Sequence, residues 1–107
     1  MTNTIEKIVE NLEKEKNVYC DILELSRKKT EIIRQGKVEE LDNIIKAEQS
    51  LVMLAGGLRG EREKLSGMIA SQMKMDIKEL TLSQLMEWVD EPLKGRMKSL
   101  QQEFIAV

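Results

Sequence analysis

The sequence predicts an all-α protein: a long antiparallel helical hairpin, a short helix, and a third helix that packs along the hairpin. Composition is the first reason, because the 107-residue chain has one proline and is rich in Glu, Lys, Leu, Ile and Met. Aromatic content is the second, since one Phe, one Tyr and one Trp cannot fill a broad globular core. The third is an apolar periodicity of three and four residues. The length suits a single domain, which we take as residues 1–107.

The first helix is predicted over residues 4–35. Asn3 or Thr4 can cap its start, and Gly36 ends it because glycine accepts the left-handed turn that follows a helix. Arg34 lies in the last turn, where a cation favours the negative end of the helix dipole. Apolar residues recur at helical spacing and form the predicted buried stripe: Ile5, Ile8, Val9, Leu12, Tyr19, Ile22, Leu23 and Ile33.

The second helix is predicted over residues 38–74, and only two or three residues join it to the first. Two helices of about 45–55 Å each, with so short a connection, must fold back on each other as an antiparallel hairpin. The predicted inward stripe is mostly apolar: Val38, Leu41, Ile45, Leu51, Val52, Ala55, Leu58, Leu65 and Ile69. Glu48 and Arg62 fall within this stripe, and we expect them to form cross-pairs inside the bundle rather than to act on a substrate.

Four glycines, Gly56, Gly57, Gly60 and Gly67, interrupt the second helical pattern. Each costs about 1 kcal/mol relative to alanine in a helix interior. Three of them, at positions 56, 60 and 67, share one face that lies nearly opposite the apolar stripe. We favour a solvent-facing segment that bends easily. The alternatives are a shallow groove for another helix, and a break of the helix at this point.

A short helix is predicted over residues 82–89. Thr81 followed three positions later by Gln84 is a capping-box pattern, which marks the start of a helix. The sequence Asp90-Glu91-Pro92 then stops this helix and starts the next, because proline suits the first helical turn and acidic residues suit its positive end.

The third helix is predicted over residues 92–106, with heptad spacing of Leu93, Met97, Leu100 and Phe104. Two heptads are short beside two long helices, and no glycine, asparagine or basic residue caps the end. We therefore expect a shortened chain with a truncated third helix. An open part of the seam would favour self-association into a homo-oligomer.

Several function classes are disfavoured by the composition. The net charge of −2 gives no basic footprint for nucleic acid, and no apolar run approaches the roughly 20 residues of a membrane span. The N-terminus is too charged for a secretory signal. Cys20 supports no internal disulfide, and the chain has no histidine to activate a nucleophile or bind a metal. We therefore predict no catalytic residues, no metal site and no cofactor.

Five short motifs occur in a fixed order along the chain. They are Tyr19 with Leu23, Leu25 and Lys29; the corner Gly36, Val38 and Leu41; Glu48 with Leu51; Glu61 and Arg62 before Leu65; and Thr81, Leu82 and Leu85. In their order and spacing these motifs resemble the FlgN family of flagellar export chaperones, and the resemblance covers roughly residues 1–90.

The resemblance implies a cytoplasmic chaperone without enzymatic activity. Its expected partners are hook–filament junction proteins of the FlgK and FlgL type, whose C-terminal amphipathic segments it shields until secretion, and the flagellar export apparatus. The family associates client binding with its C-terminal helical region, often with an Asn-rich tail, whereas this chain has no Asn after Asn43. We assign partner binding to the residues that equally suit the third seam of the bundle: Leu93, Met97, Leu100 and Phe104.

Two other readings stay open from the residues. A coiled-coil scaffold or oligomerisation module is consistent with the long charged helices, although the corner at Gly36 and the capped short helix favour a closed intramolecular bundle. A small all-helical enzyme such as a chorismate mutase needs several cationic side chains that converge on an anionic substrate. Among the arginines, only Arg62 lies well within the inward stripe, which disfavours the enzyme.

Overall fold

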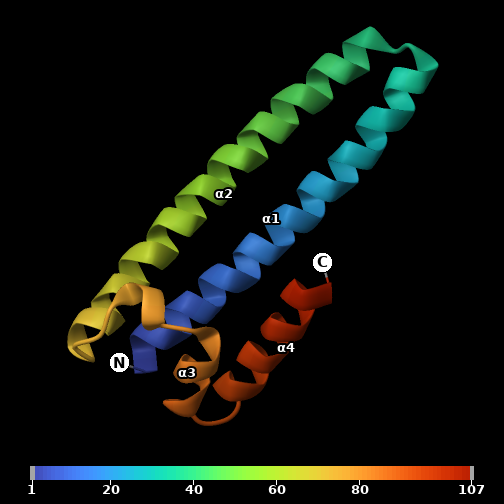
Figure 1. Cartoon of the computed structure of the whole chain (residues 1–107). Coiled ribbons are helices and arrows are strands. Elements are labelled where there is room, and N and C mark those ends of the chain that lie inside the picture. The colour runs from blue at the N-terminus through green and yellow to red at the C-terminus, as the bar shows by residue number, and fades with distance from the viewer. Residues whose placement is uncertain (1, 107) are drawn as a thin grey trace.

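The computed structural model describes residues 2–106, with side chains described for residues 2–102. Its elements are α1 (Thr2–Gln35), α2 (Val38–Gln72), the 3-10 turn η1 (Ile77–Glu79), α3 (Leu82–Glu87) and α4 (Leu93–Ala106). Helices α1 and α2 form an antiparallel hairpin, and α4 packs beside α1 (Figure 1). No strand occurs within residues 2–106, so the predicted all-α class is confirmed.

The corner of the hairpin is built by hydrogen bonds around Gly36. This residue adopts a φ of 69°, the left-handed conformation that glycine accepts without strain. The Gly36 N–H donates to the carbonyl of Ile33 at 3.2 Å, and the Lys37 N–H donates to the carbonyl of Ile32 at 3.3 Å. This pair of bonds is the Schellman motif, which satisfies two carbonyls at the end of α1 and turns the chain toward α2.

Helix α2 is continuous through its glycines and ends at Gln72, two residues before the predicted end. Its end repeats the geometry of the hairpin corner, with Lys74 in the left-handed region at a φ of 54°. The N–H groups of Lys74 and Met75 donate to the carbonyls of Ser71 and Ala70. A Cβ added at Gly56, Gly57 or Gly60 would meet no atom within 4 Å, which agrees with a solvent-facing glycine segment.

Replacing Gly57 with alanine should raise the free energy of unfolding by about 0.5–1 kcal/mol, because alanine is the better helix former and the added methyl has open space. Urea denaturation of the two proteins measures the difference. The matched control is Gly36→Ala, which should lower stability because its φ of 69° strains any residue with a Cβ. An unchanged midpoint for Gly57→Ala would contradict a helical conformation at this position.

The seam between α1 and α2 follows a seven-residue repeat in both helices. In α1 the repeat is formed by eight residues that are all buried or half-buried: Ile8, Asn11, Glu15, Val18, Ile22, Leu25, Lys29 and Ile32. In α2 it is formed by nine residues that are likewise buried or half-buried: Leu41, Ile44, Glu48, Leu51, Ala55, Leu58, Arg62, Leu65 and Ile69. Both sets alternate steps of three and four, the spacing of coiled-coil seams. The polar members pair across the seam, since Lys29 contacts Glu48 at 3.1 Å and Arg62 contacts Glu15 at 3.0 Å.

This repeat corrects the predicted stripes. Six of their residues are exposed instead: Tyr19, Leu23 and Ile33 of α1, and Val38, Ile45 and Val52 of α2. The physical reason is that polar side chains take inward positions in α1, at Asn11, Glu15 and Lys29, and find partners on α2. The exposed apolar residues therefore lie to one side of the seam rather than within it.

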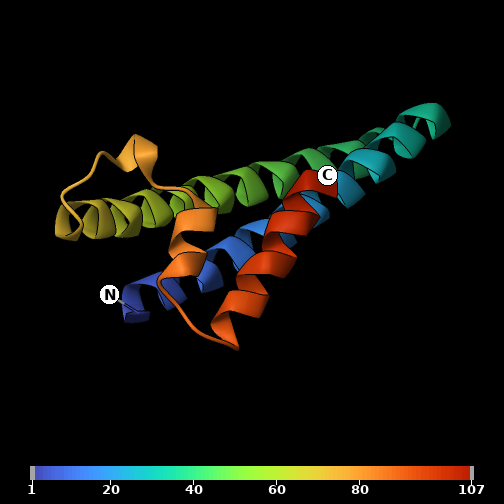
Figure 2. The ribbon, with the colours of Figure 1, turned by 60° about the horizontal axis from the view of Figure 1, so that its bottom comes forward.

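A compact core lies at the end of the hairpin that holds the N-terminus. It joins Ile5, Ile8 and Val9 of α1, Leu65 and Ile69 of α2, Leu85 and Val89 at α3 and just after it, and Leu93, Met97 and Leu100 of α4. The predicted capping box is confirmed, because the Gln84 N–H donates to Thr81 Oγ1 at 3.2 Å and the Thr81 N–H donates to Gln84 Oε1 at 3.3 Å. Within residues 2–106, the half of the hairpin near Gly36 consists of α1 and α2 alone (Figures 1 and 2).

The start of α4 is stabilised by the side chain of Glu91, which precedes the helix. Glu91 Oε2 accepts a hydrogen bond from the Gly95 N–H at 3.1 Å, so the acidic residue satisfies a free donor in the first turn. Arg96 then reaches α1, where its Nε donates to Glu13 Oε2 at 3.4 Å. This hydrogen bond raises the pKa of Arg96 above its ordinary value. The contact fixes the side of α1 on which α4 lies.

Candidate functional site

The structure places the α4 positions that the sequence assigned to partner binding inside the molecule. Leu93, Met97 and Leu100 are all buried, and they belong to the core cluster that includes residues of α1 and α2. The side chain of Phe104 lies outside the described residues. In this closed structure the three buried residues form a structural seam. Their role in partner binding stays a prediction.

An open groove lies on the side of the hairpin where α3 packs. We call it the basal groove, and it encloses about 550 Å³. Its lining comes from α1, α2 and the segment that leads into α3: Ile8, Leu12, Glu15, Lys16, Tyr19, Cys20, Leu23, Arg62, Ser66, Leu80, Thr81, Leu82 and Leu85. Most of these side chains are apolar, so the groove can take the apolar side chains of another polypeptide.

The α1 wall of the basal groove is formed by Leu12, Tyr19 and Leu23. Their spacing of seven and four residues places them on one side of the helix. Tyr19 is 48% exposed and Leu23 is 47% exposed, so both form an accessible rim. The free thiol of Cys20 is also exposed at this rim. Exposed apolar side chains that border a groove are typical of surfaces that bind another protein.

The opposite wall depends on the segment between α2 and α3. Leu80, Leu82 and Leu85 line the groove. The capping box of Thr81 and Gln84 fixes the start of α3 at Leu82. Asp76 supports the preceding turn, because its Oδ1 accepts from the Lys78 N–H at 3.0 Å. This wall is therefore held by local hydrogen bonds before any partner binds.

The ion pair between Glu15 and Arg62 borders the basal groove. The Glu15 side chain is 5% exposed and contacts Arg62 Nε at 3.0 Å. Arg62 is 35% exposed, so its guanidinium reaches from the seam toward the groove. A buried carboxylate needs such a partner, because an unpaired charge in this position would be costly. The pair adds polarity to one edge of a surface whose lining is mostly apolar.

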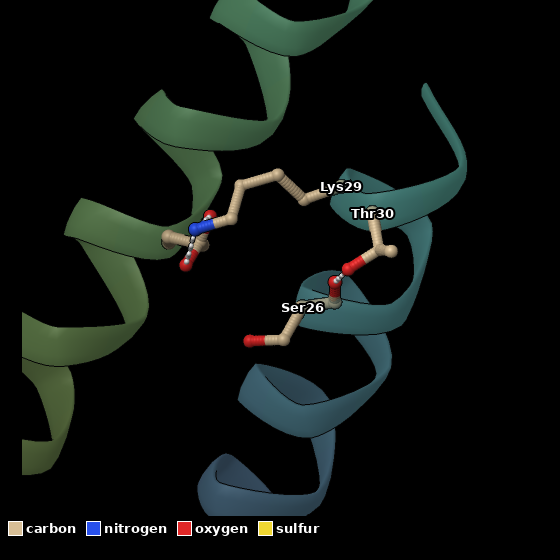
Figure 3. Close-up of polar contacts among 4 residues, drawn as sticks. Ser26, Lys29 and Thr30 are labelled. Carbon is tan, nitrogen blue, oxygen red and sulfur yellow. Dashed lines mark hydrogen bonds and ion pairs between the residues drawn. The ribbon is translucent and has the colours of Figure 1, made fainter. Parts of the chain in front are cut away.

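A second groove lies further along the hairpin, between Lys29 of α1 and the middle of α2. We call it the distal groove, and it also encloses about 550 Å³. It is lined by Lys29, Ile45, Glu48, Gln49, Val52 and Met53. Figure 3 shows Lys29 extending from α1 to the carboxylate of α2 that it pairs with, and the Thr30 hydroxyl donating to the Ser26 carbonyl. The ion pair forms the floor of this groove, and apolar side chains form its wall.

The geometry of the two grooves provides surfaces that a partner can bind. The described residues hold no group of three or more His, Cys, Asp or Glu side chains that could bind a metal ion. Cys20 has no histidine to activate it, because the sequence contains none. The two grooves can shield apolar side chains of a partner from water.

The sequence reasoning missed the rim of the basal groove. Tyr19 and Leu23 were assigned to the inward stripe, although both are outside the seven-residue repeat of Val18, Ile22 and Leu25. A strict fit to the heptad, with polar residues allowed at inward positions, would have separated the seam from the rim. The exposed apolar side chains would then have indicated a binding surface.

None of the helices, as far as the structure describes them, combines the length and the apolar character that crossing a membrane requires. The family model described as FlgN protein matches residues 1–107, the whole length of the chain. No curated protein and no solved structure gives a significant match.

Proposed function

The chain belongs to the FlgN family of flagellar export chaperones, and from this we propose that it binds the C-terminal amphipathic segments of hook–filament junction proteins of the FlgK and FlgL type. Family membership supports the binding of flagellar hook-associated proteins in general, and assigns the chain to a chaperone family rather than an enzyme family. The single observation that carries the finer proposal is the apolar basal groove with its exposed rim at Tyr19 and Leu23.

The proposed mechanism is burial of the apolar stripe of the client. Before export, the client segment lies with its apolar side chains in the basal groove, where Leu12, Leu23 and Leu82 exclude water from them. The client then cannot associate with other subunits through the same stripe. Delivery follows in the cytoplasm, where the export apparatus receives the complex and the client leaves the groove.

The buried α4 residues enter this proposal through the shape of the groove. Leu93, Met97 and Leu100 pack against the base of α1, next to α3, whose Leu85 contributes both to the core and to the groove. They would therefore affect the client by positioning α3. Gln101 Nε2 supports the same contact, since it donates to Ser83 Oγ at 3.2 Å.

Replacing Leu23 with aspartate should weaken the binding of a C-terminal FlgK- or FlgL-type peptide by about tenfold or more, because the client would bury a charge. Isothermal titration calorimetry measures the dissociation constant. Leu23 is already 47% exposed, so the variant should keep its fold, which circular dichroism checks. The control is Leu54→Asp, because Leu54 is similarly exposed but lines neither groove.

The absence of binding heat with peptides from either protein would overturn the proposed clients. If the Leu23→Asp variant and the unchanged chain bind the peptide with equal affinity, the client binds outside the basal groove. Weakening by Leu54→Asp to the same degree would show that the loss comes from added negative charge and not from the groove.

A further inference from the structure

The half of the hairpin near Gly36 carries a row of exposed apolar side chains on one face. Val38, Ile45 and Val52 are seven residues apart, so they lie on one side of α2, and all three are exposed. Ile33 is exposed at the same end of α1, and Met53 is 78% exposed at the edge of the distal groove. We call these five residues the distal face. Exposed apolar side chains that gather on one face are typical of surfaces that bind another protein.

The distal face lies on the same side of the hairpin as the basal groove. The seven-residue row of Ile45 and Val52 continues through Arg59 to Ser66, and Ser66 lines the basal groove. Between the two grooves α2 presents Gly56, where an added Cβ would meet nothing within 4 Å. Because glycine has no side chain, the surface of α2 does not protrude at this position. The two grooves therefore lie in line along α2, with Gly56 and Arg59 between them.

The other side of α1 has a different character. At the corresponding seven-residue positions it presents only polar and charged side chains: Lys7, Glu10, Lys14, Asn17, Asp21, Glu24, Lys28 and Glu31. One ion pair on this side joins Glu24 and Lys28 at 3.6 Å. A solvated face needs no apolar rows. The contrast between the two sides indicates that the distal face is meant to be covered.

Helix α4 shows what kind of element covers this fold at its base. Its 14 residues span about 21 Å, whereas the molecule is 55 Å long, so α4 covers only part of the hairpin. It packs on α1 through apolar residues in heptad spacing, with Arg96 paired to Glu13 at the edge. The uncovered part of the hairpin is long enough for another amphipathic helix. Figure 2 shows this part extending beyond α4.

We propose that the distal face binds a helical stretch of the client segment, which lies along the hairpin as a third helix and continues into the basal groove. This inference rests on the proposed function and adds the second half of the binding track. The Lys29–Glu48 pair at the floor of the distal groove then faces the client. An apolar side chain directly above it would desolvate both charges without replacing their hydrogen bonds. The client therefore has a small or polar residue at that level and apolar residues on either side.

A second copy of this chain is a poorer occupant than a client helix. The distal face is about 25 Å long and two helices wide, which offers on the order of 500 Å² per copy. Two copies would bury about 1,000 Å² in total, the lower limit for a stable interface. A client helix that occupies both the distal face and the basal groove would bury the area of both surfaces.

Two methionines provide a test that needs no change in the groove. Met53 borders the distal groove, whereas Met68 is exposed but lines neither groove. With ¹³C-methyl-labelled methionine, saturating C-terminal junction-protein peptide should shift the NMR signal of the Met53 methyl and leave that of Met68 in place. A Met53 signal that does not move, in a titration where calorimetry shows binding, overturns the inference and leaves the proposed function intact.

A substitution gives an independent readout. Val52→Asp should weaken binding of the junction-protein peptide by about tenfold, as expected for a charge inside a binding surface. Leu54→Asp, two residues away, should leave the affinity unchanged. An unchanged affinity for Val52→Asp overturns the inference. If the peptide does not bind the unchanged chain at all, the proposed function itself is wrong. A Met53 signal that moves with protein concentration, without peptide, also overturns the inference because it makes the distal face a self-association surface.

Discussion

Replacing Met97 with alanine should lower the free energy of unfolding by about 2–5 kcal/mol, the usual cost of removing a large buried side chain. Met97 is 0% exposed and lies in the cluster that joins α4 to α1 and α2. The truncation removes apolar contacts within this cluster and leaves a cavity that the rigid helices cannot close. Urea denaturation followed by far-UV circular dichroism measures the loss. In a protein of this size such a loss is a large part of the total stability.

The matched control is Met53→Ala, which removes the same atoms from a residue that is 78% exposed. It should change stability by no more than about 0.5 kcal/mol. Comparable losses in the two variants would contradict the burial of Met97. A Met97→Ala variant with unchanged stability and weaker peptide binding would support the sequence prediction that α4 contacts the partner directly.

The local features of the fold could be predicted because they depend on neighbouring residues. Gly36 ends α1 through backbone hydrogen bonds within its own turn, and Thr81 and Gln84 cap α3 through groups only three residues apart. Such signals are complete in a short stretch of sequence. The hairpin could be predicted for the same reason, because two long helices with so short a connection must fold back on each other.

The inward face of α1 could not be predicted in the same way. Glu48 and Arg62 were expected to pair inside the bundle, and they do, but their partners Lys29 and Glu15 were assigned to no stripe. A charged residue occupies an inward position only when the facing helix supplies its opposite charge. That condition depends on the register of two helices, which hydrophobic periodicity along one helix does not contain.

The candidate site required the same nonlocal information. Tyr19 and Leu23 were noticed as apolar residues and as part of the family motif, but the stripe assignment placed them in the core. They become a groove only because Leu80 and Leu82 lie opposite them after the chain has turned through η1. The position of that turn depends on contacts between segments far apart in the sequence. Residue patterns therefore indicated the family and the hairpin, but not the surface that a partner would meet.

Replacing Arg62 with leucine should lower the free energy of unfolding by about 1–3 kcal/mol. The Glu15 side chain is only 5% exposed, so without Arg62 its carboxylate keeps its burial and loses its partner. Breaking a fully buried pair costs about 3–5 kcal/mol, and the smaller value here reflects the 35% exposure of Arg62, where water screens the interaction. Glu15→Leu should cost less than Arg62→Leu, because the long Arg62 side chain can turn its guanidinium into solvent.

The double variant Glu15→Leu with Arg62→Leu separates the pair from the packing around it. Its stability should return to within about 1 kcal/mol of the unchanged protein or exceed it, because two leucines remove both the buried charge and its desolvation cost. Urea denaturation of all four proteins closes the double-mutant cycle. Additive losses would show that the two side chains do not interact in solution. A recovered stability combined with concentration-dependent light scattering would assign the pair a role in specifying the intramolecular hairpin, because an uninterrupted apolar seam pairs with other chains as readily as with itself.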